Sequence, residues 1–193
     1  YQVTDEGSER LRYGTGCWVY GEELDQQDAM WWSPDGSKLV FYEVNEDGMK
    51  DYFLTEKNAE VYTELHTVRY PKSGFPNPKV KLWVYDVATK KKSVIPIEGE
   101  PTQYLFNIQF VPNSHKVLVS RTNRHQNVLD ILMVDLDTGS LTTVVTEKQA
   151  AWQKNRPVMR FLEDGNRFVW ETERNGYKHF ELRNLSGELL NPL

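Results

Sequence analysis

The sequence contains WVYDV at residues 83–87, LMVDL at 132–136 and ELRNL at 181–185, three copies of one pattern spaced 49 residues apart. Each copy runs into a turn, and each is preceded by a second turn that follows an aromatic residue. These upstream turns are WSPDG at 32–36, FVPNS at 110–114 and FLEDG at 161–165. A repeat of this length predicts a chain built from copies of one supersecondary unit.

The runs between the turns are short and rich in β-branched and aromatic residues, which predicts strands. The expected second strands are 38–44, 116–120 and 167–171, the third strands are 80–86, 129–135 and 178–184, and the fourth strands are 93–97, 141–145 and 188–190. Connections of a few residues require antiparallel hairpins, since parallel strands need long crossovers. Each unit is therefore predicted to be a four-stranded meander.

Several of the predicted strands are apolar on both faces, as in LVFY at 39–42 and ILMV at 131–134. Such strands predict sheets that are covered on two sides, and stacked sheets with this period are typical of a β-propeller. A flat β-sandwich is the competing architecture, but it does not explain the repeat. We predict an all-β fold, a partial β-propeller of four-stranded antiparallel blades, with about three complete blades plus part of a preceding one.

The expected blades cover residues 28–97, 104–146 and 157–193 of a single propeller fragment, residues 1–193. The first blade carries about 30 extra residues, roughly 45–77, between its second and third strands. Connections of this length are usually functional, and we expect the insert to project from the blade. Because three blades cannot close a ring, the piece should expose two apolar blade faces and self-associate.

Composition excludes several classes of function. The net charge is −5 and the basic residues are spread along the chain, which argues against a nucleic-acid partner. Cys17 is the only cysteine, so no intrachain disulfide or multi-Cys metal site is available. The sequence has no apolar run long enough to span a bilayer and no phosphate-loop or metal-binding motif. We expect no cofactor and no metal, and the compartment cannot be read from these residues.

Four further motifs lie in order between about residues 15 and 179. They are WVYGEE at 18–23, WWSPDG at 31–36, RYPKSG at 69–74 followed by NP at 77–78, and ERNGYKH at 173–179. Together they resemble the propeller of the dipeptidyl peptidase IV family. In that family a Glu pair on a short helical segment protrudes into the central cavity and binds the protonated α-amino group of the substrate. The resemblance assigns this role to Glu22 and Glu23, whereas Cys17 and Gly21 depart from the acidic residues common at their positions.

The chemistry of such a pair can be stated from the residues alone. An α-amino group has a reference pKa of about 7.7 to 8.0, so at neutral pH it is mostly an ammonium with three donors. Two carboxylates can accept two of these donors in charge-assisted hydrogen bonds. Holding the amine at a fixed distance from a nucleophile selects which peptide bond is cleaved. We expect the neighbouring Trp18 and Tyr20 to anchor the segment by packing.

The resemblance further implies a substrate-gating segment of a serine exopeptidase that releases N-terminal dipeptides after Pro or Ala. Its partners would be a peptide with a free N-terminus and a second copy of the chain, reached by the insert at 45–77. The family resemblance suggests a periplasmic, secreted or membrane-anchored extracytoplasmic location.

Catalytic residues are not expected in this chain. The catalytic α/β-hydrolase domain of the family carries its serine in a Gly-x-Ser-x-Gly motif, which does not occur here. The histidines are not expected to meet a Ser and an Asp, and each is interpreted as structural or exposed: His66, His115, His125 and His179.

Two other functions compete with this interpretation. A non-catalytic propeller could serve as a protein-interaction scaffold, with the Glu pair incidental. A related oligopeptidase that binds internal segments is disfavoured, because it has no use for a group that binds an amine.

Overall fold

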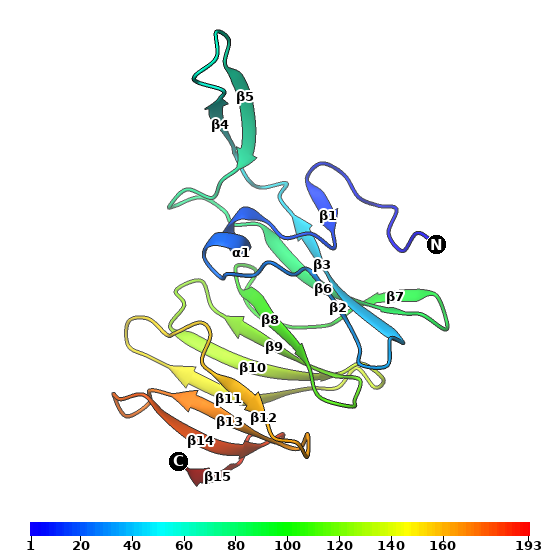
Figure 1. Ribbon diagram of the computed structural model, residues 1–193, viewed down its shortest axis with the longest axis vertical. Helices are drawn as coiled ribbons and strands as arrows, with labels where there is room; N and C mark the ends of the chain where they lie inside the picture. Colours follow the sequence, from blue (N-terminus) through cyan, green and yellow to red (C-terminus); the bar gives the residue numbers. More distant parts are fainter.

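The computed structural model describes residues 1–193 and contains fifteen strands and one short helix. Its blades stack one on the next, with the C-terminus at the far end from the projecting hairpin (Figure 1). The first blade contains β1 (Leu11–Tyr13), β2 (Met30–Trp32), β3 (Lys38–Asn45), β6 (Lys79–Asp86) and β7 (Lys91–Val94). The second contains β8 (Tyr104–Phe110), β9 (Lys116–Thr122), β10 (Val128–Asp135) and β11 (Leu141–Lys148). The third contains β12 (Met159–Phe161), β13 (Arg167–Thr172), β14 (His179–Asn184) and β15 (Leu189–Pro192).

Every strand pair in these sheets is antiparallel, and the second and third blades follow the chain order of a meander. The second strands β3, β9 and β13 begin at Lys38, Lys116 and Arg167, the positions that the preceding turns predict. The structure confirms the predicted all-β partial propeller. No helix in it has the length and apolarity needed to cross a bilayer.

Strand β3 shows why the sequence is apolar on both faces. Its side chains alternate between two cores, because successive residues of a strand point to opposite faces. Val40 and Tyr42 belong to the large core that continues into the second blade, whereas Leu39 and Phe41 belong to a smaller core on the other face. Tyr42 also crosses to the second blade, donating its hydroxyl to the Leu105 carbonyl oxygen at 2.7 Å. The stacking of blades therefore explains why β3 is apolar on both of its faces.

A buried carboxylate joins the second blade to the third. Glu147 on β11 is 1 % exposed. It accepts hydrogen bonds from Trp170 Nε1 at 2.8 Å, from Thr172 Oγ1 at 3.2 Å, and from Arg174 Nε and Nη2 at 3.1 and 2.8 Å. Four donors thus converge on two oxygens, which compensates for the loss of hydration.

The first strand of the first blade is split in two. β2 pairs with residues 39–41 of β3, and β1 pairs with residues 43–45 of the same strand. β1 therefore belongs to the first sheet and not to a sheet of its own. Between these two short strands the chain leaves the sheet over residues 14–29, which we call the excursion. It begins at Gly14, with φ +64°, where a Cβ would lie 2.9 Å from the Met30 sulfur. The positive φ favours glycine here, because other residues are strained in this conformation.

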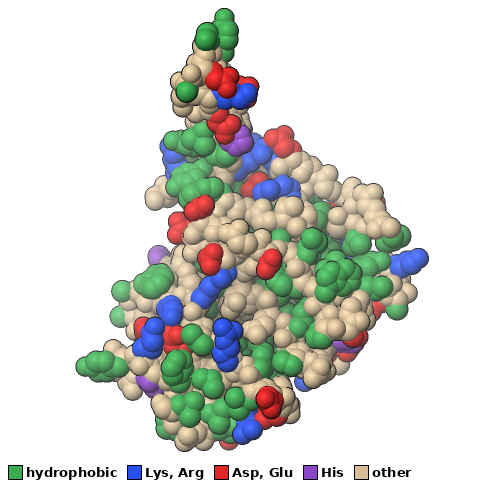
Figure 2. Space-filling view, in the orientation of Figure 1, with side chains coloured by type: hydrophobic (Ala, Val, Ile, Leu, Met, Phe, Trp, Pro, Cys, Tyr) green, Lys and Arg blue, Asp and Glu red, His purple; other side chains and the backbone are tan.

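The insert at 45–77 contains a two-stranded hairpin of β4 (Asp51–Glu56) and β5 (Glu64–Arg69), which we call the arm. It rises away from the blades in Figure 1. Hydrophobic side chains are visible at its tip in Figure 2. Val61 and Tyr62, in the turn between β4 and β5, are 91 % and 84 % exposed. The arm therefore presents apolar surface that nothing in the chain covers.

Candidate functional site

Helix α1 (Trp18–Glu22) lies at the centre of the excursion, and Glu23 is its C-cap residue. Its N-cap residue, Cys17, makes no side-chain capping bond, since a thiol is a poor substitute for the usual Asp or Ser. The Cys17 side chain is buried instead, and burial raises the pKa of its thiol to about 11. A helix of five residues without a cap is unstable alone. Tertiary contacts must therefore hold it.

The second blade supplies the main contacts to the excursion. Tyr20 is fully buried and accepts a hydrogen bond from the Leu105 backbone N–H at 3.1 Å. Gln26 Oε1 accepts another from the Asn107 N–H at 2.7 Å. Asn107 has φ +50° and lies at a register shift in β8, so its N–H is free to face the excursion. Leu105 and Asn107 on β8 therefore each donate a backbone N–H to a side chain of the excursion.

The connection between the second and third blades and the base of the arm supply the remaining contacts. Arg156 bonds the Asp25 carbonyl oxygen at 2.6 Å and its carboxylate at 3.3 Å. On the opposite side, the rings of Trp18 and Tyr70 meet edge to face with centroids 4.3 Å apart. Trp18 and Tyr20 therefore pack as the sequence predicts. The helix and the residues that follow it are therefore held by the second blade, by the connection to the third blade and by the base of the arm.

Glu22 and Glu23 are both exposed and take part in no ion pair or side-chain hydrogen bond within the chain. Glu23 lines a cavity of about 450 Å³, together with Trp18, Tyr70, Tyr104 and Arg124. Glu22 is adjacent in sequence but does not line this cavity. The basic side chains of the cavity leave the Glu23 carboxylate unpaired, so it remains able to accept hydrogen bonds from a cationic ligand.

A second polar cluster joins the first two blades, and the sequence interpretation missed it. His115 Nδ1 lies 2.9 Å from Asp137 Oδ2, and His115 Nε2 lies 3.1 Å from Ser37 Oγ. The expectation that no histidine meets both a Ser and an Asp is therefore wrong. The reason is the blade packing, which brings the β2–β3 turn against the β8–β9 turn although they are far apart in sequence.

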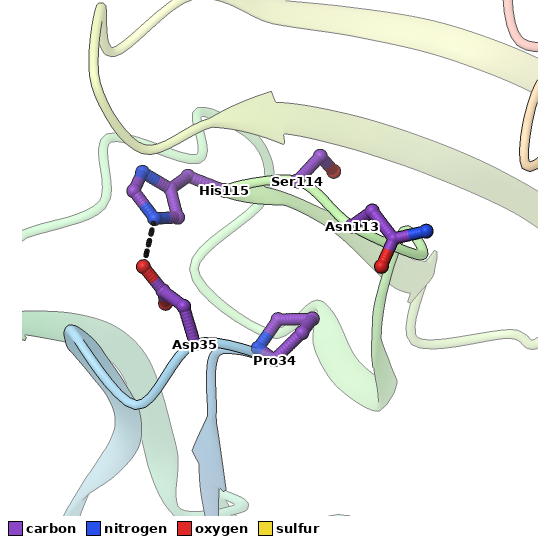
Figure 3. Close-up of a pocket in the computed structure, with 5 residues that line it drawn as sticks. All are labelled: Pro34, Asp35, Asn113, Ser114 and His115. Atoms are coloured by element: carbon purple, nitrogen blue, oxygen red, sulfur yellow. Dashed lines mark hydrogen bonds and ion pairs between the residues drawn. The ribbon is translucent and has the colours of Figure 1, made fainter.

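This cluster does not have the chemistry of a nucleophilic triad. His115 Nε2 also lies 3.0 Å from Asp35 Oδ2, the contact drawn in Figure 3, and Ser37 Oγ donates to Asp35 Oδ1 at 2.9 Å. Hydrogen bonds to Asp35 and Asp137 raise the pKa of His115, which favours the imidazolium. The Ser37 proton is directed at Asp35 and not at His115, so the histidine is not placed to take it. Lys38 Nζ lies 3.1 Å from Asp137, so the cluster is an ionic contact between blades.

We expect the stability of the protein to depend on pH through this contact. Because the pKa of His115 is raised on folding, its contribution is complete below its unfolded pKa of about 6.5 and is lost as the pH rises through the folded value. The pKa values of Asp35 and Asp137 are lowered, so their contribution is lost on acidification below about pH 4. The Tm difference between wild type and His115→Asn, measured by circular dichroism, should be larger at pH 5.5 than at pH 9. A difference that is constant or grows with pH would contradict this.

Several residues of the first site carry no signal in the sequence. Gln26 reaches a bulge in another blade, and Tyr104 and Arg124 reach the Glu23 cavity from the second blade. None of these three residues belongs to a sequence motif that would indicate a binding site. Only the packing of blades brings them beside α1.

Comparisons with known proteins agree with this geometry. All of residues 1–193 match the family described as the dipeptidyl peptidase IV (DPP IV) N-terminal region. The chain is 30 % identical over 183 residues to dipeptidyl aminopeptidase B of Saccharomyces cerevisiae, which covers 91 % of this chain and 22 % of the relative. The crystal structure of Porphyromonas gingivalis dipeptidyl peptidase 4 superposes with a TM-score of 0.89 at 25 % identity, over 100 % of this chain and 28 % of that one.

The chain spans about a fifth of the length of the curated relatives it matches. The similarity to them and to the solved structure extends over most or all of these residues, including α1 and the blades. The chain belongs to the dipeptidyl peptidase IV N-terminal region family.

Proposed function

We propose that this chain recognises the N-terminus of peptides for a dipeptidyl peptidase IV-like serine exopeptidase that releases N-terminal dipeptides after Pro or Ala. In this proposal the propeller segment gates and orients the substrate, and the chemistry takes place in another domain. The observation that carries the proposal is the Glu pair. Both carboxylates are exposed and unpaired on a helix braced by separate blades, and Glu23 lines a cavity.

The contacts that hold α1 in place matter because the proposed role of the Glu pair is to position the substrate amine. An amine held by a mobile carboxylate would not fix the distance between the substrate N-terminus and a nucleophile. Tyr20, Gln26 and Asp25 are each tied to a different point on the neighbouring blades. The excursion therefore has the rigidity that a fixed distance requires.

The proposal is tested by comparing a peptide that has a free N-terminus with its N-acetylated form. In the full-length protein that carries this segment, the free amine should be strongly preferred. Equal cleavage of both forms would contradict the proposal, because the acetylated form offers no ammonium to Glu22 and Glu23.

We also propose that the arm mediates homodimerisation. Phe53, Val61, Tyr62 and Leu65 expose more than half of their surface on the arm. Burying such side chains against a second copy would stabilise a dimer by about 1.5 to 3 kcal/mol each. Replacing Val61 and Tyr62 by Ser should therefore weaken the dimer at least about ten-fold in sedimentation velocity at micromolar concentration.

A matched control for the arm is Phe75→Ser, which removes an apolar side chain that is 53 % exposed but lies outside the hairpin. It should leave the dimer intact. A strictly monomeric wild type, or a dimer that Val61→Ser and Tyr62→Ser do not weaken, would contradict the proposal.

A further inference from the structure

The cavity beside Glu23 holds two basic side chains that no carboxylate neutralises. Lys72, at the base of the arm, and Arg124, in the turn between β9 and β10, both line it. The Lys72 ammonium lies 4.6 Å from the centre of the Tyr52 ring and pairs with no acid. Arg124 makes one side-chain hydrogen bond, to the Tyr104 hydroxyl, out of the five that a guanidinium can donate. Most donors of both cations are therefore available.

The Tyr104 hydroxyl is a third hydrogen-bond donor that lines this cavity, beside Lys72 and Arg124. Its side chain is 2 % exposed, and its hydroxyl oxygen accepts from Asn77 Nδ2 at 2.6 Å and from Arg124 Nη1 at 2.5 Å. Two accepted bonds occupy both lone pairs of the oxygen. The phenol proton has no acceptor within the chain, and a buried donor without a partner is costly. An acceptor in the cavity would satisfy it.

The charges of the cavity select the kind of ligand that fits. Glu23 contributes one negative charge, and Lys72 and Arg124 contribute two positive charges. A peptide whose only nearby charge is its ammonium would leave both cations without a partner. A ligand that carries an ammonium and a carboxylate on the same residue complements both signs. Both groups then fall within one cavity of about 450 Å³.

We propose that Arg124, with the Tyr104 hydroxyl and Lys72, forms a carboxylate subsite that favours peptides whose first residue is Asp or Glu. The inference rests on the proposed function, because it places the α-amino group of that residue on Glu23. The side-chain carboxylate then accepts hydrogen bonds from the Arg124 guanidinium and the phenol proton. Planar guanidinium and carboxylate groups are matched for such contacts.

The test is calorimetric binding of three peptides to the full-length protein: Asp-Ala amide, Asn-Ala amide and N-acetyl-Asn-Ala amide. Asp and Asn have the same shape and differ in charge. Asp-Ala amide should bind about five-fold more tightly than Asn-Ala amide, the effect of one partly exposed ion pair. Arg124→Gln should remove this preference. Arg160→Gln, which removes the same charge from an exposed position on β12 outside the cavity, should leave the preference intact.

Each outcome decides one point. Equal or weaker binding of Asp-Ala amide to wild type would overturn the subsite, and a preference that survives in Arg124→Gln would overturn the assignment to Arg124. If Arg124→Gln does not fold, Lys72→Gln is the second variant and should reduce the same preference. The comparison of Asn-Ala amide with its acetylated form tests the Glu pair separately, because neither peptide carries a carboxylate. The two proposals can therefore fail independently.

Discussion

Replacing Glu22 and Glu23 together by Gln is expected to lower kcat/KM for a dipeptide substrate with a free amine by about 100-fold or more in the full-length protein. Each lost charge-assisted hydrogen bond contributes about 1.5 to 3 kcal/mol, and each 1.4 kcal/mol corresponds to a factor of ten. Wild type should cleave the free-amine substrate much faster than its acetylated counterpart. The double variant should cleave both at similar, low rates.

The single variants sharpen this prediction. Glu23 lines the cavity and Glu22 does not, so Glu23→Gln should have the larger effect. Asp28→Asn is the matched control, since Asp28 is an exposed acid on the same excursion. It removes the same charge and should leave the discrimination unchanged. If Asp28→Asn reduces the preference for the free-amine substrate as much as Glu23→Gln does, the preference arises from the overall negative charge of the excursion and not from a contact with Glu23.

The second large effect is expected in stability. Glu147→Gln should lower the free energy of unfolding by about 3 kcal/mol, because it breaks a buried, hydrogen-bonded charge pair. The Gln amide would also direct an N–H₂ group at donors such as Trp170 Nε1 or Arg174, which the carboxylate now satisfies. For a domain of this size the expected loss in Tm is about 6 to 12 °C by differential scanning calorimetry.

Glu163→Gln provides the control for this variant. Glu163 lies exposed in the turn between β12 and β13, so the same chemical change there should shift Tm very little. A Glu147→Gln protein as stable as Glu163→Gln would mean that the contact between the second and third blades contributes little.

Much of the fold could be predicted from the sequence because the repeat and the turns are local signals. WVYDV at 83–87 and its later copies set the period, and the apolar pattern of β3 indicated sheets covered on both faces. The split of the first strand into β1 and β2 could not be predicted. Both pieces are only three residues long, and their pairing depends on which stretch of β3 each one meets.

The candidate site was only partly accessible from sequence. Glu22 and Glu23 stood out through a resemblance carried by ordered motifs. Arg124 and Tyr104 did not, because a cavity between blades depends on how the sheets stack and not on any local pattern. The ionic contact of His115 was missed for the same reason, since its partners Asp35 and Asp137 lie in turns of different hairpins.

A crystal structure of the full-length protein with an uncleaved peptide that has a free N-terminus tests the central claim most directly. The account predicts the peptide nitrogen within about 2.7 to 3.2 Å of a Glu23 carboxylate oxygen, with Glu22 adjacent and α1 in its present position. A bound peptide whose N-terminus lies away from α1, with Glu22 and Glu23 facing only solvent, would contradict it.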